Sequence, residues 1–130
     1  MSLKIIIAGS RTITDYDQLI HALMGAIKAG VIAPSTSFEI ISGGAKGVDM
    51  LARRYATESG YVLTEMKPQY NGADGRNNRA APIRRNIDIA NYGDVLIAVW
   101  DGTSPGTKHI ISYMRQIGKP VYVHTVNTYN

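Results

Sequence analysis

Five short apolar runs, rich in Ile and Val, recur along the 130-residue chain. They span residues 3–8, 38–42, 61–66, 94–100 and 120–126. Apolar residues mostly follow one another in these runs instead of alternating with polar ones, which is typical of parallel strands buried on both faces. The pattern therefore predicts five strands of one parallel sheet.

Between the runs, four segments repeat apolar residues every three or four positions, which is the period of a helix with one buried face. The repeats are Tyr16, Leu19, Leu23 and Ile27; Val48, Leu51, Ala52 and Tyr55; Ile83, Ile87 and Ala90; and Ile110, Met114 and Ile117. Strands that alternate with helices predict an α/β fold in three layers, with right-handed connections and helices on both faces of the parallel sheet.

Residues that begin or end helices flank these segments. Thr14 or Asp15 can cap the first helix, and Pro82 suits the first turn of the third. A glycine follows each helical segment and is expected to stop the helix. These glycines are Gly30, Gly60, Gly93 and Gly118.

The length of 130 residues is that of one domain, and we expect residues 1–130 to form a single domain. Polar residues and glycines dominate residues 67–81, which predicts a long, mobile loop. The chain has no cysteine, which excludes disulfides and thiolate sites and is typical of a reducing compartment. No apolar stretch approaches the roughly 20 residues of a membrane span, so we expect a cytoplasmic protein without a membrane partner.

The formal net charge of +4 is concentrated in one segment. Residues 67–85 hold five Lys and Arg residues and a single Asp, whereas basic and acidic residues balance in the rest of the chain. Such a segment is either a solvated loop or a surface that attracts an anion.

His21, His109 and His124 lack the spacing of metal ligands, so we predict no metal site.

Four short segments have the composition of turns that bind phosphate: residues 9–11, 42–47, 84–86 and 101–108. Three of them follow a predicted strand and lead into a helix, and the fourth lies at the start of the third helix. Glycine lets backbone N–H groups approach an anion, and the first turn of a helix leaves such groups without partners. Because the carboxyl ends of parallel strands meet at one edge, we predict one site for a phosphate-bearing ligand.

The candidate phosphate- and ligand-binding residues come from these segments. They are Gly9, Ser10, Arg11, Gly43, Gly44, Lys46, Gly47, Arg85, Asn86, Asp101, Gly102, Ser104, Gly106 and Thr107. The structural alternative is that the glycines only make turns and that Arg11 and Lys46 point into solvent. Asp49 is expected to brace the neighbouring loop, and Trp100 either packs on the rim of the core or stacks on a base.

Four segments resemble the SLOG superfamily in their order and context, and most of all its YspA-like branch, which is found in bacteria and phages. These segments are Ala8–Arg11, Ser42–Asp49, Pro82–Asn86 and Trp100–Thr107. The resemblance implies a Rossmann-like five-stranded sheet of order 3-2-1-4-5 that binds nucleotides or their derivatives across the first and fourth strands. Relatives include cytokinin-activating phosphoribohydrolases, the DNA-processing protein DprA and sensors of nucleotide-derived signals. The resemblance therefore does not select one function.

One position departs from the pattern of the phosphoribohydrolases. Their last motif places a catalytic glutamate where this chain has Ile110, and an isoleucine side chain moves no proton. The departure favours binding over hydrolysis, so we assign no catalytic residue. Asp49 and Asp101 stay open as substitutes for the missing acid.

We therefore expect a sensor or sequestering module for a nucleotide-derived small molecule, such as an ADP-ribose-like or cyclic-nucleotide species, with no certain cofactor. Two alternatives remain. One is a nucleoside-phosphate N-glycosidase or transferase with a non-standard catalytic acid. The other is a DprA-like DNA-binding protein that uses Lys67, Arg76 and Arg79. A homodimer that pairs through a helix face is a further expectation.

Overall fold

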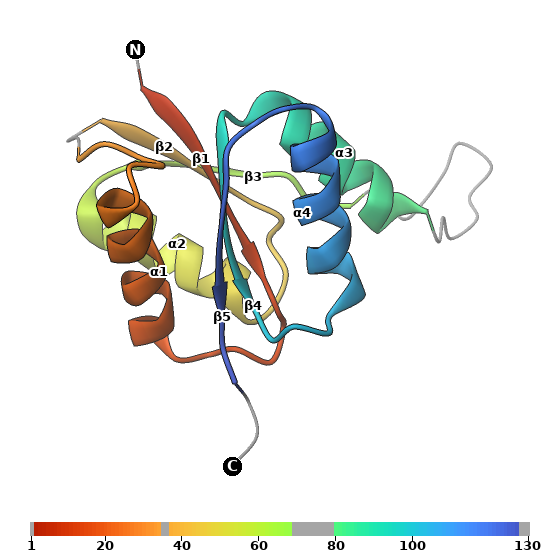
Figure 1. The fold of residues 1–130 in the computed structure, drawn as a ribbon, viewed down its shortest axis with the longest axis horizontal. Helices are drawn as coiled ribbons and strands as arrows, with labels where there is room; N and C mark the ends of the chain where they lie inside the picture. Colours follow the sequence, from red (N-terminus) through yellow and green to blue (C-terminus); the bar gives the residue numbers. More distant parts are fainter. Residues whose placement is uncertain (1, 35–36, 69–79, 128–130) are drawn as a thin grey trace.

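The structure is a computed structural model, and it describes residues 2–34, 37–68 and 80–127. Strands and helices alternate along the chain, as the sequence predicts (Figure 1). The elements are β1 (Leu3–Gly9), α1 (Tyr16–Lys28), β2 (Phe38–Ser42), α2 (Val48–Ser59), β3 (Val62–Glu65), α3 (Ala81–Tyr92), β4 (Val95–Trp100), α4 (Pro105–Gln116) and β5 (Val121–Thr125). Most of the loop predicted at 67–81 lies outside the described residues.

All five strands pair in parallel, in the order β3-β2-β1-β4-β5. β1 lies at the centre of the sheet, where Ile5 is paired with Ile40 of β2 on one side and with Val95 of β4 on the other. The predicted α/β class and the order 3-2-1-4-5 are both confirmed. The fold is Rossmann-like.

Side chains of the central strands point alternately to the two faces of the sheet, and two helices cover each face. Ile5 and Ile7 belong to the core under α1 and α2, whereas Ile6 belongs to the core under α3 and α4. All three side chains are fully buried. The apolar runs are continuous because both faces of these strands are core.

The strand order reverses direction after β3. The chain adds β2 and β3 on one side of β1 and then returns to add β4 and β5 on the other side. Because parallel connections are right-handed, the reversal places α1 and α2 on one face and α3 and α4 on the opposite face, as Figure 1 shows. A reversal of this kind leaves a crevice beyond the carboxyl ends of β1 and β4.

The helix ends follow the predicted capping residues. Asp15 caps α1 by accepting a hydrogen bond from the backbone N–H of Asp17 at 3.0 Å, and Gly60 ends α2 in the left-handed conformation. Gly93 after α3 has φ −80° and ψ 163°, which is extended backbone. A Cβ on Gly93 would lie 2.3 Å from Cγ1 of Ile6, so close packing on β1 and not a left-handed turn requires glycine there.

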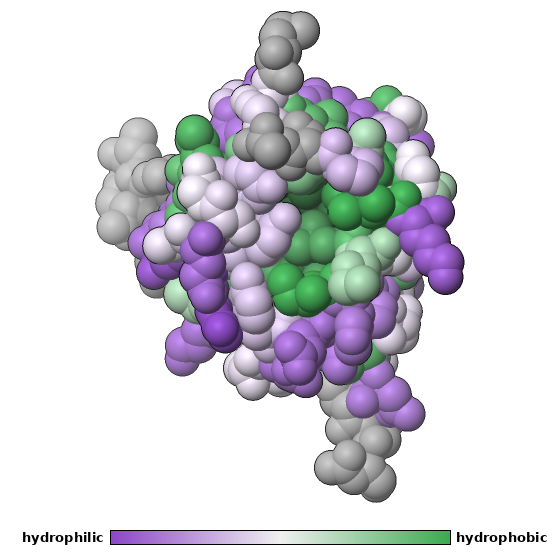
Figure 2. Space-filling view, turned by 90° about the vertical axis from the view of Figure 1, so that its left-hand side faces the viewer, coloured by the Kyte–Doolittle hydropathy of each residue, from purple (hydrophilic) through white to green (hydrophobic). Residues whose placement is uncertain are grey.

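Apolar side chains gather in a hollow on the face that carries α1 and α2 (Figure 2). The exposed apolar residues of α1 include Met24, at 62% exposure.

Across the described parts of the chain, no helix has the length and apolar character needed to cross a membrane. The expected homodimer stays a prediction.

Candidate functional site

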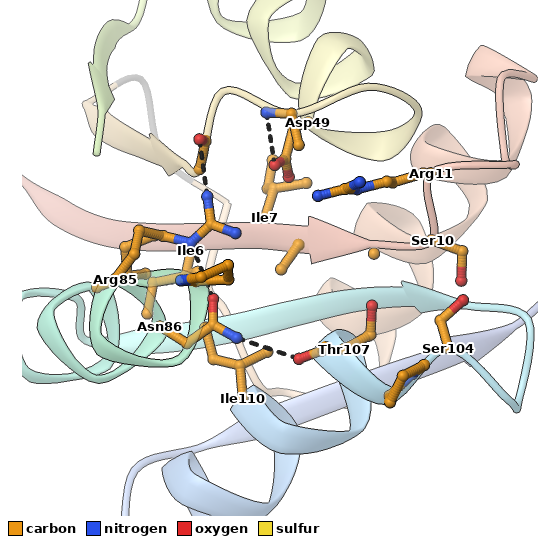
Figure 3. A pocket seen from close by; sticks show the side chains of 18 of the residues that line it. Ile6, Ile7, Ser10, Arg11, Asp49, Arg85, Asn86, Ser104, Thr107 and Ile110 are labelled. Atoms are coloured by element: carbon orange, nitrogen blue, oxygen red, sulfur yellow. Dashed lines mark hydrogen bonds between the residues drawn. The ribbon is translucent and has the colours of Figure 1, made fainter. Parts of the chain in front are cut away.

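A cavity of about 370 Å³ opens beyond the carboxyl ends of β1 and β4 (Figure 3). Its volume lies within the ~300–1,000 Å³ that is typical of small-molecule sites. All four predicted phosphate-type segments contribute to its lining. Their lining residues are Gly9, Ser10, Arg11, Gly43, Ala45, Arg85, Asn86, Ser104, Pro105, Gly106 and Thr107.

Apolar side chains form the floor of this cavity. Ile6 of β1, Ile89 of α3 and Ile110 of α4 line it, and all three belong to the buried core between the sheet and these two helices. Figure 3 shows polar side chains from the β1–α1 loop, α2, α3 and α4 around this floor. The arrangement suits a ligand with an apolar ring at one end and charge at the other.

The loop after β1 supplies a buried hydroxyl and an exposed cation. The backbone N–H of Ser10 donates to the carbonyl of Val99 at 3.1 Å, and its Oγ accepts the N–H of Asp101 at 3.0 Å. These bonds join the loops after β1 and β4. Arg11 extends over the cavity in Figure 3, and within the described ranges its guanidinium has no hydrogen bond or ion pair.

The glycine-rich loop between β2 and α2 uses several of its backbone N–H groups internally. The N–H of Gly44 donates to Oγ of Ser42 at 3.2 Å, and the N–H of Ala45 donates to Oδ2 of Asp49 at 3.0 Å. The N–H of Val48, the first residue of α2, donates to the carbonyl of Ser10 at 3.3 Å. The fold therefore supplies acceptors for these three N–H groups, and the predicted contact of Gly43 and Gly44 with a phosphate stays a prediction.

Two glycines of this loop make room for cationic side chains. A Cβ on Gly43 would lie 2.3 Å from Nη1 of Arg85, and a Cβ on Gly44 would lie 2.9 Å from Cε of Lys67. Gly44 also has a φ of 71°, which favours glycine. The absence of side chains at these positions lets two cations from other elements lie directly on the loop.

Gly9 and Gly47 serve packing between loops. A Cβ on Gly9 would lie 2.0 Å from the carbonyl oxygen of Val99, and a Cβ on Gly47 would lie 2.4 Å from that of Ser10. Gly47 precedes α2 as its N-cap, with a φ of 73°, and it does not line the cavity. Close approach to the backbone of the β1–α1 loop explains this glycine, and its predicted contact with phosphate stays a prediction.

Asp49 is the only carboxylate among the described residues that line the cavity, and it is 7% exposed. Burial raises the pKa of its carboxyl above the ordinary value, while the hydrogen bond from Ala45 and the charges of Arg85 and Arg11 act in the opposite direction. The contact with Ala45 braces the loop, which is the role that the sequence favours. A buried carboxyl with a raised pKa in a cavity is also a candidate acid or base.

Arg85 and Asn86 connect two sides of the cavity. Arg85 donates from Nη1 to the carbonyl of Gly43 at 2.9 Å and from Nε to Oδ1 of Asn86 at 3.0 Å. Asn86 donates from Nδ2 to the carbonyl of Gly106 at 3.2 Å. This series of bonds ties the β2–α2 loop through α3 to the first turn of α4, and it holds the rim of the cavity in one geometry.

The first turn of α4 presents backbone N–H groups to the cavity. Pro105 has no N–H, and the N–H of Lys108 donates to the carbonyl of Ser104 at 3.1 Å. Between them, the N–H groups of Gly106 and Thr107 have no backbone or side-chain acceptor in the described parts of the chain. A Cβ on Gly106 would meet no protein atom within 4 Å, so the space over this turn is open to a ligand.

Asp101 and Trp100 shape the loop before α4 and do not line the cavity. Asp101 accepts hydrogen bonds from the N–H groups of Thr103 at 2.9 Å and Ser104 at 2.7 Å. Desolvation acts to raise the pKa of Asp101, but these bonds outweigh it and hold the pKa well below its usual range. Trp100 donates from Nε1 to the carbonyl of Ser104 at 3.0 Å, and Gly102 turns the loop with a φ of 87°.

The remaining predicted residues, Gly44 and Lys46, line a second hollow next to the cavity. Sequence reasoning missed Pro82 and Ile83, which line the cavity itself. Their signal was present, because they precede Asn86 by four and three positions and such residues share one face of a helix.

The structure describes the candidate metal ligands and part of the segment that was predicted to contact DNA. Within residues 2–34, 37–68 and 80–127, no three His, Asp or Glu side chains gather into a group that could hold a metal ion. Of the residues predicted to contact DNA, Lys67 lines the second hollow, whereas Arg76 and Arg79 lie outside the described residues. DNA binding therefore stays a prediction.

A solved structure and a family model are similar to this chain. The chain is similar to the X-ray structure of TM1055, a structural genomics target, with a TM-score of 0.61 and 19% identity over 92% of this chain and 72% of that chain. At this identity, the similarity shows the fold alone. No curated protein matches the sequence. The family model described as "YspA, cpYpsA-related SLOG family" matches residues 3–71, which is more than half of the chain. The chain therefore belongs to the YspA, cpYpsA-related SLOG family.

Proposed function

We propose that this chain binds a nucleotide-derived small molecule in the cavity beyond β1 and β4. The observation that carries the proposal is that Arg11 lines the same cavity as Gly106 and Thr107, whose N–H groups have no acceptor in the described parts of the chain. A cation and a helix N-terminus together select an anion, and the apolar floor accommodates a base or sugar. The resemblance to SLOG proteins favours a nucleotide as the molecule that combines these parts.

Each part of the site has a distinct role in this proposal. The first turn of α4 holds a phosphate with its backbone amides, and Arg11 neutralises the charge. Arg85 and Asn86 fix the distance between the β2–α2 loop and α4 through the hydrogen bonds described above. None of these contacts requires a proton to move, so we propose binding without turnover.

Thermal unfolding in the presence of nucleoside phosphates and NAD derivatives tests the proposal. A ligand that binds only the folded state stabilises it by RT ln(1 + [L]/Kd), about 2.7 kcal/mol at a concentration of 100 Kd. Gly106→Ala is the diagnostic variant, because its methyl group meets no protein atom and favours the helix but fills the open space over the turn. We expect this variant to melt at or above the wild-type temperature and to lose the shift caused by the ligand.

Ser112→Ala is the matched control for this experiment. Ser112 is an exposed residue of α4 that does not line the cavity, so the substitution should keep the ligand-induced shift. A screen in which no nucleotide stabilises the wild type would contradict the proposal. So would an undiminished shift in Gly106→Ala.

Asp49 favours one alternative, an N-glycosidase or transferase that acts on a nucleoside phosphate. Ile110 lines the cavity but offers no proton, and the carboxylate of Asp101 is engaged within its own loop. Asp49 is left as the acid or base, with a pKa that burial has raised. Chromatography after incubation with nucleoside monophosphates should detect no released base. Release by the wild type that Asp49→Asn abolishes would establish the enzyme instead.

A further inference from the structure

A second hollow of about 540 Å³ adjoins the cavity. Arg11, Gly43, Ala45 and Arg85 line both spaces, so the two meet across the β2–α2 loop. The basic residues of the second hollow are Arg11, Lys46, Lys67 and Arg85. No acidic residue is among the described residues that line it.

The fold holds two of these cations in place. The side chain of Lys67 crosses Gly44, where the missing Cβ leaves room for Cε, and Arg85 lies on Gly43 and donates to its carbonyl at 2.9 Å. The positions of the two glycines in the sequence thus determine where the positive charges gather. Lys46 comes from the same loop and Arg11 from the loop after β1.

The two spaces differ in chemistry. The first cavity has an apolar floor, one carboxylate and the unpaired amides of α4, which suit a nucleoside and one phosphate. The second has four cations and an aliphatic contribution from Met50 and Pro68. Like charges gathered around a hollow raise its potential and concentrate anions there. A ligand that fills both spaces therefore needs additional negative charge beyond its first phosphate.

We propose that the ligand carries a second phosphate, which occupies the basic hollow while the nucleoside and first phosphate occupy the cavity. The chemical class is that of nucleoside diphosphates and pyrophosphate-linked nucleotides, in preference to nucleoside monophosphates. The inference rests on the proposed function, because it places the second phosphate relative to a nucleotide at α4. Arg11 and Arg85 line both spaces and lie between the two phosphates.

Calorimetric titration with matched pairs of nucleotides tests this inference. The pairs AMP and ADP, GMP and GDP, CMP and CDP, and UMP and UDP differ within each pair by one phosphate. For the recognised base, the diphosphate should bind at least about tenfold more tightly, which corresponds to about 1.4 kcal/mol. In the double variant Lys46→Ala/Lys67→Ala, the affinity for the diphosphate should fall to that for the monophosphate, whose own affinity stays unchanged.

The control has the same loss of charge at a distance from the site. Lys28→Ala/Arg115→Ala removes two exposed cations that line neither space, and both affinities should stay at wild-type values. Lys46 and Lys67 are also exposed, so their replacement leaves the core intact.

The possible results separate the two proposals. Equal affinities for mono- and diphosphates in the wild type overturn the second phosphate and leave nucleotide binding in place. An equal loss of affinity for both ligands in Lys46→Ala/Lys67→Ala also overturns it, because the basic hollow would then serve the first phosphate. If no nucleotide of any pair binds and no NAD derivative stabilises the protein in the melting experiment, the proposed function itself is overturned.

Discussion

At the scale of single residues, the fold shifts the pKa values of two aspartates near the site in opposite directions. Asp49 is buried, and desolvation raises its pKa. Asp101 is also subject to desolvation, but the hydrogen bonds from Ser104 and Thr103 lower its pKa. The difference follows from the number of donors directed at each carboxylate, because hydrogen bonds to the ionised form favour ionisation.

Asp49→Asn is expected to change how stability depends on pH. The folded-state pKa of Asp49 is raised above its ordinary 3.8, so the free energy of unfolding falls as the pH rises through that folded-state value. Asparagine keeps an oxygen for the N–H of Ala45 and has no charge to titrate. The variant should therefore be at least as stable as the wild type at about pH 7, as measured by urea unfolding at about pH 4 and about pH 7.

Asp49→Ala controls for the hydrogen bond alone. It leaves the N–H of Ala45 without its acceptor and should cost about 1–3 kcal/mol at both pH values. The same pH dependence in wild type and Asp49→Asn would show that the carboxyl titrates as in the unfolded chain.

Asp101→Ala should be destabilising at neutral pH, by about 1–3 kcal/mol, because the N–H groups of Thr103 and Ser104 lose their acceptor. The folded-state pKa of Asp101 lies below its ordinary value of 3.8. Its stabilising effect is therefore present above that value and is lost as the pH falls through the folded-state pKa. Urea unfolding over a series of acidic pH values should show the wild type approaching the variant. Ser112→Ala, which changes an exposed residue of α4 that has no carboxylate, should follow the wild type at every pH.

At the scale of elements, the ends of helices are fixed by contacts with distant parts of the chain. Lys119, just before β5, donates from Nζ to the carbonyls of Ala90, Asn91 and Gly93 at 2.8, 3.0 and 2.7 Å. These bonds satisfy carbonyl groups at the end of α3 that the helix leaves unpaired. Gly47 has the corresponding role at the start of α2, where it lets the helix approach the β1–α1 loop.

Gly47→Ala is expected to be more destabilising than Gly60→Ala. Both glycines have a φ of 73°, so an alanine is strained at either position. A Cβ on Gly60 meets no atom within 4 Å, whereas a Cβ on Gly47 lies 2.4 Å from the carbonyl oxygen of Ser10. This overlap should add roughly 1–3 kcal/mol to the loss for Gly47→Ala in urea unfolding. Equal losses would mean that the β1–α1 loop moves aside at little cost.

At the scale of the whole molecule, the reversal of strand order builds the site. The β1–α1 and β2–α2 loops lead into helices on one face, whereas α3 and α4 lie on the other. The ligand that we propose for the cavity would therefore contact both halves of the fold. We expect its binding to stabilise the packing of the two halves against β1 and β4 together.

Hydrogen exchange should show which amides the ligand uses. With a nucleotide found in the melting screen, exchange at Gly106 and Thr107 should slow, because their N–H groups have no acceptor in the described parts of the unliganded chain. Gly44 and Ala45 should change much less, since Ser42 and Asp49 already accept from them. Protection confined to Gly44 and Ala45 would place the phosphate on the β2–α2 loop instead.

The sequence by itself determined the elements and much of the lining of the cavity. The strands agree with the predicted runs to within one residue at either end, because burial on both faces leaves a local pattern in the chain. Asp15 and Gly60 could also be predicted as helix caps, because a cap depends on residues that are neighbours in the sequence. All four glycine-rich or basic segments reach the cavity because strand ends share one edge.

Only the tertiary structure decided which of those residues face the cavity. The N–H of Val48 is bound by Ser10, and the space beside Gly44 is filled by Lys67, which lies 23 positions further along the chain. Asp101 is turned into its own loop, and Gly106 is left open. A hydrogen-bond donor is satisfied by whichever acceptor the fold brings near it, and that choice depends on contacts between distant segments that no local pattern records.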